Sequence, residues 1–122
     1  MNLTQILKDQ IDKEGAVLDN AKSDDKGLRT AIKTAREIRK VLAEQIRVLK
    51  KRIKEADRTA NGEDARVLRR SLAFFREQYN DFHEEMFMYR AQLSQVTKFI
   101  STQKPLVVAM DAEWEKSKVE TQ

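Results

Sequence analysis

Cysteine is absent from the 122 residues, so disulfides, thiolate nucleophiles and cysteine-ligated zinc are excluded. Histidine occurs once, which leaves no second histidine for a usual zinc site. No apolar run approaches the roughly 18 residues that a membrane-spanning helix needs. Residues 1–10 alternate polar and apolar side chains and include Lys8 and Asp9, so they do not resemble a signal peptide. These absences predict a soluble, cytoplasmic protein with no membrane partner and no cofactor.

Glycine and proline are also scarce, with three and one, while charged residues make up 36% of the chain. This balance is typical of long helices with solvated faces. The strongest pattern is a run of apolar or aromatic residues at steps of three and four: Leu68, Leu72, Phe75, Tyr79, Phe82, Met86, Tyr89, Leu93, Val96 and Ile100. Such steps return to one face of a helix, and their mean of 3.5 residues is the heptad repeat of a coiled coil.

A second run, entirely aliphatic, precedes the first one: Leu28, Ile32, Ala35, Ile38, Leu42, Ile46, Leu49, Ile53 and Ala56. Asn61-Gly62 between the two runs is the strongest break in the chain, because either residue tolerates the left-handed conformation that ends a helix. Ser23-Asp24-Asp25 resembles a helix start, and Pro105 is expected to stop or restart a helix. Helices are therefore predicted at about 3–22, 26–59, 63–103 and 105–118.

The predicted fold is all-α, in a single domain over 1–122. It consists of a long antiparallel, coiled-coil-like helical hairpin with short N- and C-terminal helices forming a bundle at its open end. The other end, residues 47–76, would be a basic hairpin arm with ten basic and four acidic residues. A two-helix arm leaves one flank of each helix exposed to solvent, so we expect association with copies of the same chain.

Charge is unevenly distributed, since residues 26–76 carry sixteen basic and six acidic groups whereas both ends are mildly acidic. A basic stripe at helical spacing suits phosphate groups or an acidic protein partner, but it also suits a solvated outer face. No aromatic residue is interleaved with the stripe on the 26–59 helix, so base stacking there is not expected. The candidate contacts are Arg36, Lys40, Arg47, Lys51, Lys54, Arg58, Arg66, Arg69 and Arg70.

The aromatic run offers a second candidate surface, because Met and aromatic side chains bind varied partners. At helical spacing such residues are more often core. The residues predicted to contact an oligomer or partner are Leu72, Phe75, Tyr79, Phe82, Met86, Tyr89 and Trp114. Trp114 either closes the base of the bundle or anchors a partner, and the sequence does not separate the two alternatives.

His83 lies among Asp81, Glu84 and Glu85, which raises the question of a metal site. A di-iron helical bundle places Glu three residues before the His, where this chain has Asn80. A surface histidine beside carboxylates is the favoured interpretation, without a metal ligand set. Gly-rich phosphate loops and nucleophile elbows are missing as well, so no catalytic residue is predicted.

The leading functional prediction is a non-enzymatic protein that acts through protein contacts, as an assembly, scaffold or regulatory component. Small cysteine-free helical proteins are common among phage and mobile-element products, an analogy of composition alone. The alternative is sequence-nonspecific nucleic-acid binding through the basic arm.

Overall fold

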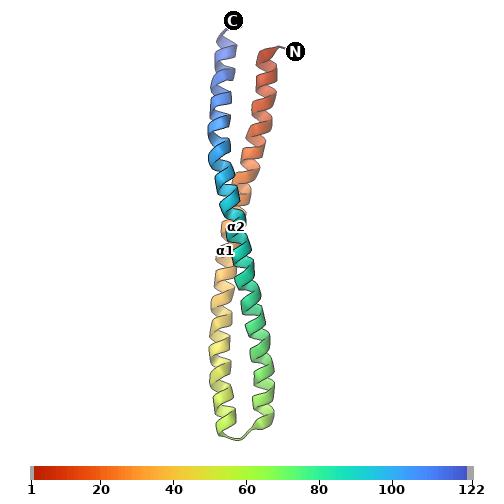
Figure 1. The fold of residues 1–122 in the computed structure, drawn as a ribbon, viewed down its shortest axis with the longest axis vertical. Coiled ribbons are helices and arrows are strands. Elements are labelled where there is room, and N and C mark those ends of the chain that lie inside the picture. Colours follow the sequence, from red (N-terminus) through yellow and green to blue (C-terminus); the bar gives the residue numbers. More distant parts are fainter. Residues whose placement is uncertain (1, 121–122) are drawn as a thin grey trace. The chain divides into compact units, whose positions relative to one another are not determined.

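The computed structural model describes residues 2–120 and contains two long helices (Figure 1). Helix α1 spans Leu3–Arg58 and helix α2 spans Gly62–Glu120. The described residues include no strand. The prediction of an all-helical chain is confirmed.

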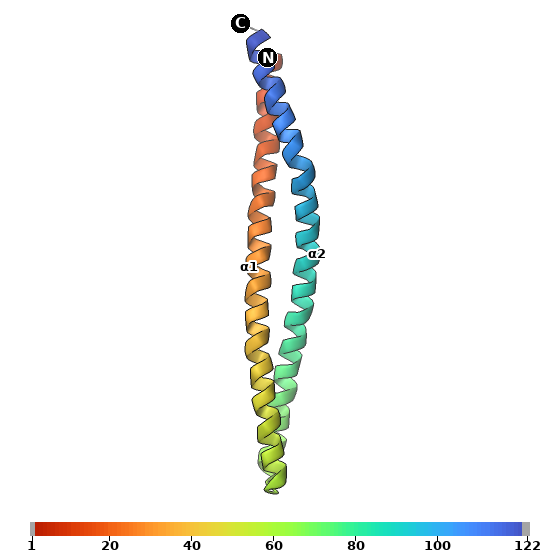
Figure 2. The same cartoon turned by 90° about the vertical axis from the view of Figure 1, so that its left-hand side faces the viewer.

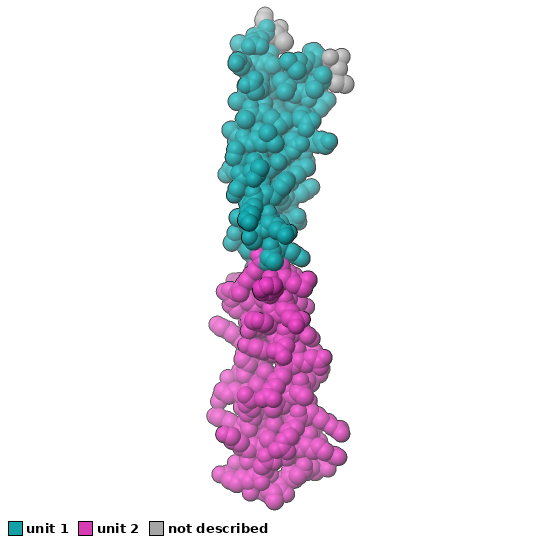
Figure 3. Space-filling model, in the orientation of Figure 1, with its two compact units in different colours: residues 1–29, 91–122 teal, residues 30–90 magenta. Residues whose placement is uncertain are grey.

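The chain divides into two compact units (Figure 3). Unit 1 combines residues 1–29 with 91–122, and unit 2 comprises residues 30–90. In each unit a segment of α1 lies beside a segment of α2, as both ribbon views show (Figure 1 and Figure 2). The two helices run antiparallel: Thr4 contacts Ser117 and Glu14 contacts Gln103 in unit 1, while Arg39 contacts Tyr79 in unit 2.

The two helices meet along one face of each, which we call the seam. All seam positions are buried or partly buried, and they follow strict steps of three and four through both helices. On α1 they are Thr4, Leu7, Ile11, Glu14, Leu18, Ala21, Asp25, Leu28, Ile32, Ala35, Arg39, Leu42, Ile46, Leu49, Ile53 and Ala56. On α2 they are Ala65, Leu68, Leu72, Phe75, Tyr79, Phe82, Met86, Tyr89, Leu93, Val96, Ile100, Gln103, Val107, Met110, Trp114 and Ser117.

The predicted helix break near residues 22–26 is wrong, because α1 continues through Ser23-Asp24-Asp25. The seam keeps its step from Ala21 to Leu28, and packing outweighs a local signal that would suit a cap. Asp25 lies in the seam, where its carboxylate accepts a hydrogen bond from Arg29 one turn later and another from Thr97 of α2. The carboxylates that resembled a helix start therefore act as side chains of a continuous helix.

The predicted break at Pro105 is wrong for the same reason, since α2 continues through it. Pro105 is exposed, on the side of α2 away from the seam. The carbonyl of Ser101, which loses its usual donor there, can therefore bond to water. Two hydroxyls in the preceding turn donate to backbone carbonyls, Ser101 to Thr97 and Thr102 to Lys98, an arrangement that often accompanies a bend. Without separate terminal helices, the four-helix bundle predicted at the open end does not form in the described residues.

The turn between the helices lies where the sequence predicted it. Ala60, with φ of 60°, adopts the left-handed conformation that was expected of Asn61 or Gly62. The backbone N–H of Asn61 donates to Ala56 and that of Ala60 to Asp57, the two bonds of a Schellman cap. The side chain of Asn61 then caps α2 by accepting a hydrogen bond from the Asp64 backbone.

Polar residues interrupt the apolar seam at a few positions and pair across it. In unit 1 the Thr4 and Ser117 hydroxyls are 3.3 Å apart, and the Gln103 amide donates to the Glu14 carboxylate. Such pairs favour one register of two helices, because a slip would leave polar groups buried without partners.

Unit 2 contains the most unusual polar seam residue. The sequence placed Ile38 in the seam, whereas the register of the structure places Arg39 there with Ile38 beside it. The Arg39 guanidinium donates to the Tyr79 hydroxyl at 2.9 Å and to the Met86 sulfur at 3.4 Å. It also lies 4.7 Å from the centre of the Tyr79 ring. The Tyr79 hydroxyl therefore has a hydrogen-bond partner within the seam.

Candidate interaction surfaces

The described residues contain no group of three or more His, Asp or Glu side chains positioned to hold a metal ion. His83 is exposed on unit 2. No helix in the described part of the chain is long and apolar enough to cross a membrane.

The residues predicted to contact an oligomer or partner all belong to the seam between α1 and α2 of the same chain. In unit 2, Leu72 and Met86 are buried, and the other members of this set are partly buried. Their contact with a second chain stays a prediction. Phe87 and Met88, which follow the seam residue Met86 in the sequence, are exposed.

Trp114 occupies a seam position in unit 1 and is partly buried. The Lys8 ammonium lies 4.9 Å from the centre of its ring and that of Lys118 lies 4.2 Å away. Each contact contributes about 0.5–1 kcal/mol at a partly exposed site. Trp114 therefore contacts both α1 and α2, which favours a role in packing the two helices over a role as an anchor for a partner.

Basic residues gather on one flank of the seam in unit 2, which we call the basic flank. Its cations are Lys33, Arg36, Lys40, Arg47, Lys50 and Lys54 on α1, and Arg66, Arg69, Arg76 and Arg90 on α2. The one carboxylate at these heptad positions is Asp57, whose oxygen lies 2.7 Å from an Arg69 nitrogen. This flank therefore carries a large positive excess along its length.

A groove of about 440 Å³ lies on the basic flank between the two helices. The apolar floor of this groove consists of Ile53, Leu72 and Ala73. Four cationic side chains line its rim: Lys50, Lys54, Arg69 and Arg76. The cationic rim favours anions, and the apolar floor favours a ligand with hydrophobic groups as well.

The structure separates the nine predicted basic contacts into two sets. Six of them lie on the basic flank: Arg36, Lys40, Arg47, Lys54, Arg66 and Arg69. The other three, Lys51, Arg58 and Arg70, lie on the outer faces of the helices, directly away from the seam. Four further cations of the basic flank are not among the nine: Lys33, Lys50, Arg76 and Arg90. The alignment of Lys50 and Arg90 with the others becomes visible only when the seam of both helices is known.

The other flank of the seam is apolar. In unit 2 we define the apolar flank by Ile38, Val41 and Val48 on α1 and by Val67, Phe74 and Met88 on α2. Val41 is 61% exposed, Phe74 57% and Met88 58%. Phe74 touches Phe75 edge to face, with ring centroids 5.7 Å apart. This flank presents large apolar side chains to water.

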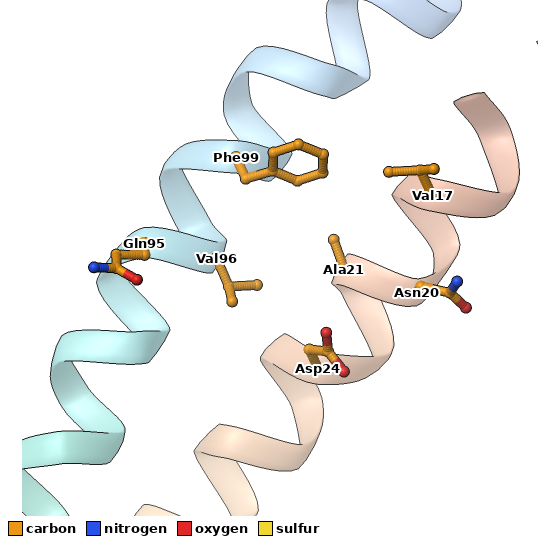
Figure 4. Close-up of a pocket in the computed structure, with 7 residues that line it drawn as sticks. All are labelled: Val17, Asn20, Ala21, Asp24, Gln95, Val96 and Phe99. Carbon is orange, nitrogen blue, oxygen red and sulfur yellow. The ribbon is translucent and has the colours of Figure 1, made fainter. Parts of the chain in front are cut away.

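Unit 1 repeats this pattern at the same heptad positions. Figure 4 shows a groove of about 420 Å³ in which Phe99 of α2 and Val17 of α1 point toward each other above Ala21 and Val96. Three more exposed apolar residues lie along the same flank of unit 1, at the heptad positions that define the apolar flank of unit 2: Leu3, Ile6 and Leu106. Each unit thus has one flank rich in exposed apolar side chains.

Two carboxylates, those of Asp25 and Glu44, have a lowered pKa. The Arg29 hydrogen bond lowers the pKa of Asp25 from its ordinary value, and Arg47 likewise lowers the pKa of Glu44. Both pairs lie one helical turn apart and support α1 locally. Neither pair forms part of a reactive site.

No protein-family model, no curated protein and no solved structure matches the chain.

Proposed function

We propose that this chain is a non-enzymatic helical interaction protein that works as an assembly, scaffold or regulatory component through protein contacts. The observation that carries the proposal is the distribution of exposed apolar side chains. Of the twelve large hydrophobic residues that are exposed in the described chain, nine lie on the apolar flank positions of the two units. They are Leu3, Ile6, Val17, Val41, Val67, Phe74, Met88, Phe99 and Leu106.

Solitary apolar residues on a surface are ordinary, but apolar residues gathered on one face mark an interaction surface. The two-helix, coiled-coil-like hairpin is therefore proposed to be completed by association, with a homo-oligomer as the simplest form.

The test is light scattering coupled to size-exclusion chromatography over a hundredfold range of concentration. We expect a mass above that of one chain at high concentration, at both low and high salt. A single-chain mass throughout, with no binding of added proteins from the same source, would refute the proposal.

A second candidate function, sequence-nonspecific binding of nucleic acid, is favoured by the basic flank of unit 2. Cations spaced along a helix release counterions from a phosphate backbone, and the affinity would fall steeply with salt. Reversing Lys40, Arg47 and Lys54 to Glu removes three cations from this flank. The matched control reverses Lys51, Arg58 and Arg70, which changes the net charge equally on the outer faces.

If the basic flank binds phosphates, the first triple variant abolishes binding to a fluorescent duplex at low salt. The control triple variant retains most of the affinity, because its charges lie away from the flank. Equal losses in both variants would show that net charge alone attracts the duplex. Absence of binding by the unmodified protein would eliminate this second candidate.

A further inference from the structure

The apolar flank of unit 2 contains three charged residues that find no ion-pair partner among the described residues: Arg52, Asp81 and Glu85. All three are exposed. On this flank Glu55 pairs with Arg58, which leaves Arg52 as the one cation at these heptad positions of unit 2. A partner that binds this flank must therefore cover apolar side chains, place a negative charge near Arg52 and place a positive charge near Asp81 and Glu85.

The unpaired charges are separated along the unit. Arg52 lies at the level of Ala73 on α2, since its neighbours Lys50 and Ile53 share a groove with that residue. Asp81 and Glu85 lie at the level of Arg39, whose guanidinium contacts Tyr79 and Met86 on either side of them. Arg52 and Arg39 both lie on α1, so the two levels are about 20 Å apart at 1.5 Å per helical residue.

We propose that the apolar flank of unit 2 binds the same flank of a second copy of this chain, in antiparallel orientation. This inference rests on the proposed function and specifies its partner and surface. A two-fold axis beside Gln78 brings Arg52 of each copy to Asp81 and Glu85 of the other. A parallel arrangement would place Arg52 against Arg52 and carboxylates against carboxylates, which costs free energy on both counts.

The same two-fold operation pairs the apolar side chains. Val67 of each copy faces Met88 of the other, because the midpoint of the two residues along α2 lies between Glu77 and Gln78. Phe74 of each copy lies beside Val41 of the other, so the most exposed aliphatic and aromatic groups of the flank are covered together. The interface would be an apolar strip with an ion pair at each end, the usual division into core and rim.

The charge of the basic flanks also favours a dimer joined through the apolar flanks over a dimer joined through the basic flanks. Two copies joined through their basic flanks would oppose ten cations with ten, with Asp57 the one carboxylate on each side. Joining through the apolar flanks keeps these cations apart and leaves both basic flanks accessible to solvent.

The first experiment is a charge exchange followed by light scattering. Arg52→Glu should raise the dimer dissociation constant at least about tenfold, because two symmetric ion pairs become repulsive. The double variant Asp81→Arg, Glu85→Arg should do the same, and an equimolar mixture of the two variants should form a heterodimer. Lys54→Glu on the basic flank is the control and should leave the dimer unchanged.

The absence of cysteine allows an independent test of orientation. Val67→Cys and Met88→Cys are prepared separately and mixed under mild oxidation. Antiparallel docking gives a mixed disulfide between the two variants, with little disulfide in either variant alone. Each variant carries one cysteine, so no disulfide can close within a chain.

The outcomes distinguish this inference from the proposed function. Disulfide formation by Val67→Cys alone would indicate a parallel dimer and overturn the inference. A dimer insensitive to both charge variants would place the interface elsewhere, overturning the inference while the proposed function stands. Circular dichroism of each variant confirms that the helices are retained. A monomeric parent protein would overturn both.

Discussion

Arg39 gives the sharpest test of how the seam is stabilised. Its guanidinium lies in a seam that is otherwise apolar at neighbouring positions, and none of the ion pairs among the described residues involves it. Its Nε is shielded from solvent and has no hydrogen-bond acceptor within the described chain. We expect Arg39→Leu to stabilise the protein, since charged groups in such positions are often worse than hydrophobic ones of similar volume.

The magnitude follows from three contributions. Removing an unsatisfied, shielded donor gains about 1–3 kcal/mol, and burying part of a leucine gains about 1–2 kcal/mol. Losing the hydrogen bond to Tyr79 and the stacking on its ring costs about 1.5–2 kcal/mol. The three contributions sum to a net gain of about 0–3.5 kcal/mol in the free energy of unfolding, with a midpoint of about 2 kcal/mol.

Urea unfolding followed by circular dichroism measures this gain, at one fixed protein concentration because association also stabilises. Arg36→Leu is the matched control: it makes the same chemical change on the exposed basic flank and should alter stability by less than about 0.5 kcal/mol. The double variant Arg39→Leu, Tyr79→Phe tests whether the freed hydroxyl limits the gain. A loss of 1 kcal/mol or more in Arg39→Leu would refute the reasoning, because the contacts to Tyr79 and Met86 would then outweigh the burial cost.

Three further predictions concern single residues. Pro105→Ala restores a backbone donor within α2 and should raise the free energy of unfolding by about 2 kcal/mol in urea; unchanged stability would show that water fully satisfies the freed carbonyl. Ala60→Gly should gain about 1 kcal/mol by thermal unfolding, since glycine adopts the left-handed turn conformation without strain. Because Arg29 lowers the pKa of Asp25, the pair stabilises the folded state at pH values above the ordinary pKa of an aspartate. This stabilisation is lost as the pH falls through the lowered pKa of Asp25. Asp25→Asn should therefore reduce the acid sensitivity of unfolding, and an unaltered pH profile would contradict this attribution.

The sequence predicted the two long helices and their turn because large apolar side chains repeat at steps of three and four on both sides of Asn61-Gly62. It did not predict that α2 continues past Pro105. Gln103 and Ser117 occupy seam positions there but are polar, so the repeat was hidden. Local signals at Asp25 and Pro105 compete with packing, and the outcome depends on contacts made by the other helix.

The candidate surfaces were predicted less completely, for a geometric reason. A basic stripe drawn on one helix cannot distinguish Lys51 on the outer face from Lys50 on the flank. That distinction needs the position of the partner helix. The apolar flank was missed for the same reason, because Val41 and Phe74 are far apart in the sequence and belong to a common strip only after the helices pair.

The topology of the two units also sets an order of folding. Contacts in unit 2 join residues 12 positions apart near the turn and 40 apart at Arg39 and Tyr79, whereas those in unit 1 join residues 89 and 113 apart. Closing a short loop loses less chain entropy than closing a long one. We therefore expect pairing to begin at the turn and to proceed outward. During synthesis the first half of α1 leaves the ribosome before residues 91–120, so its apolar face has no intramolecular partner and is exposed to chaperones or to neighbouring nascent chains until that segment follows.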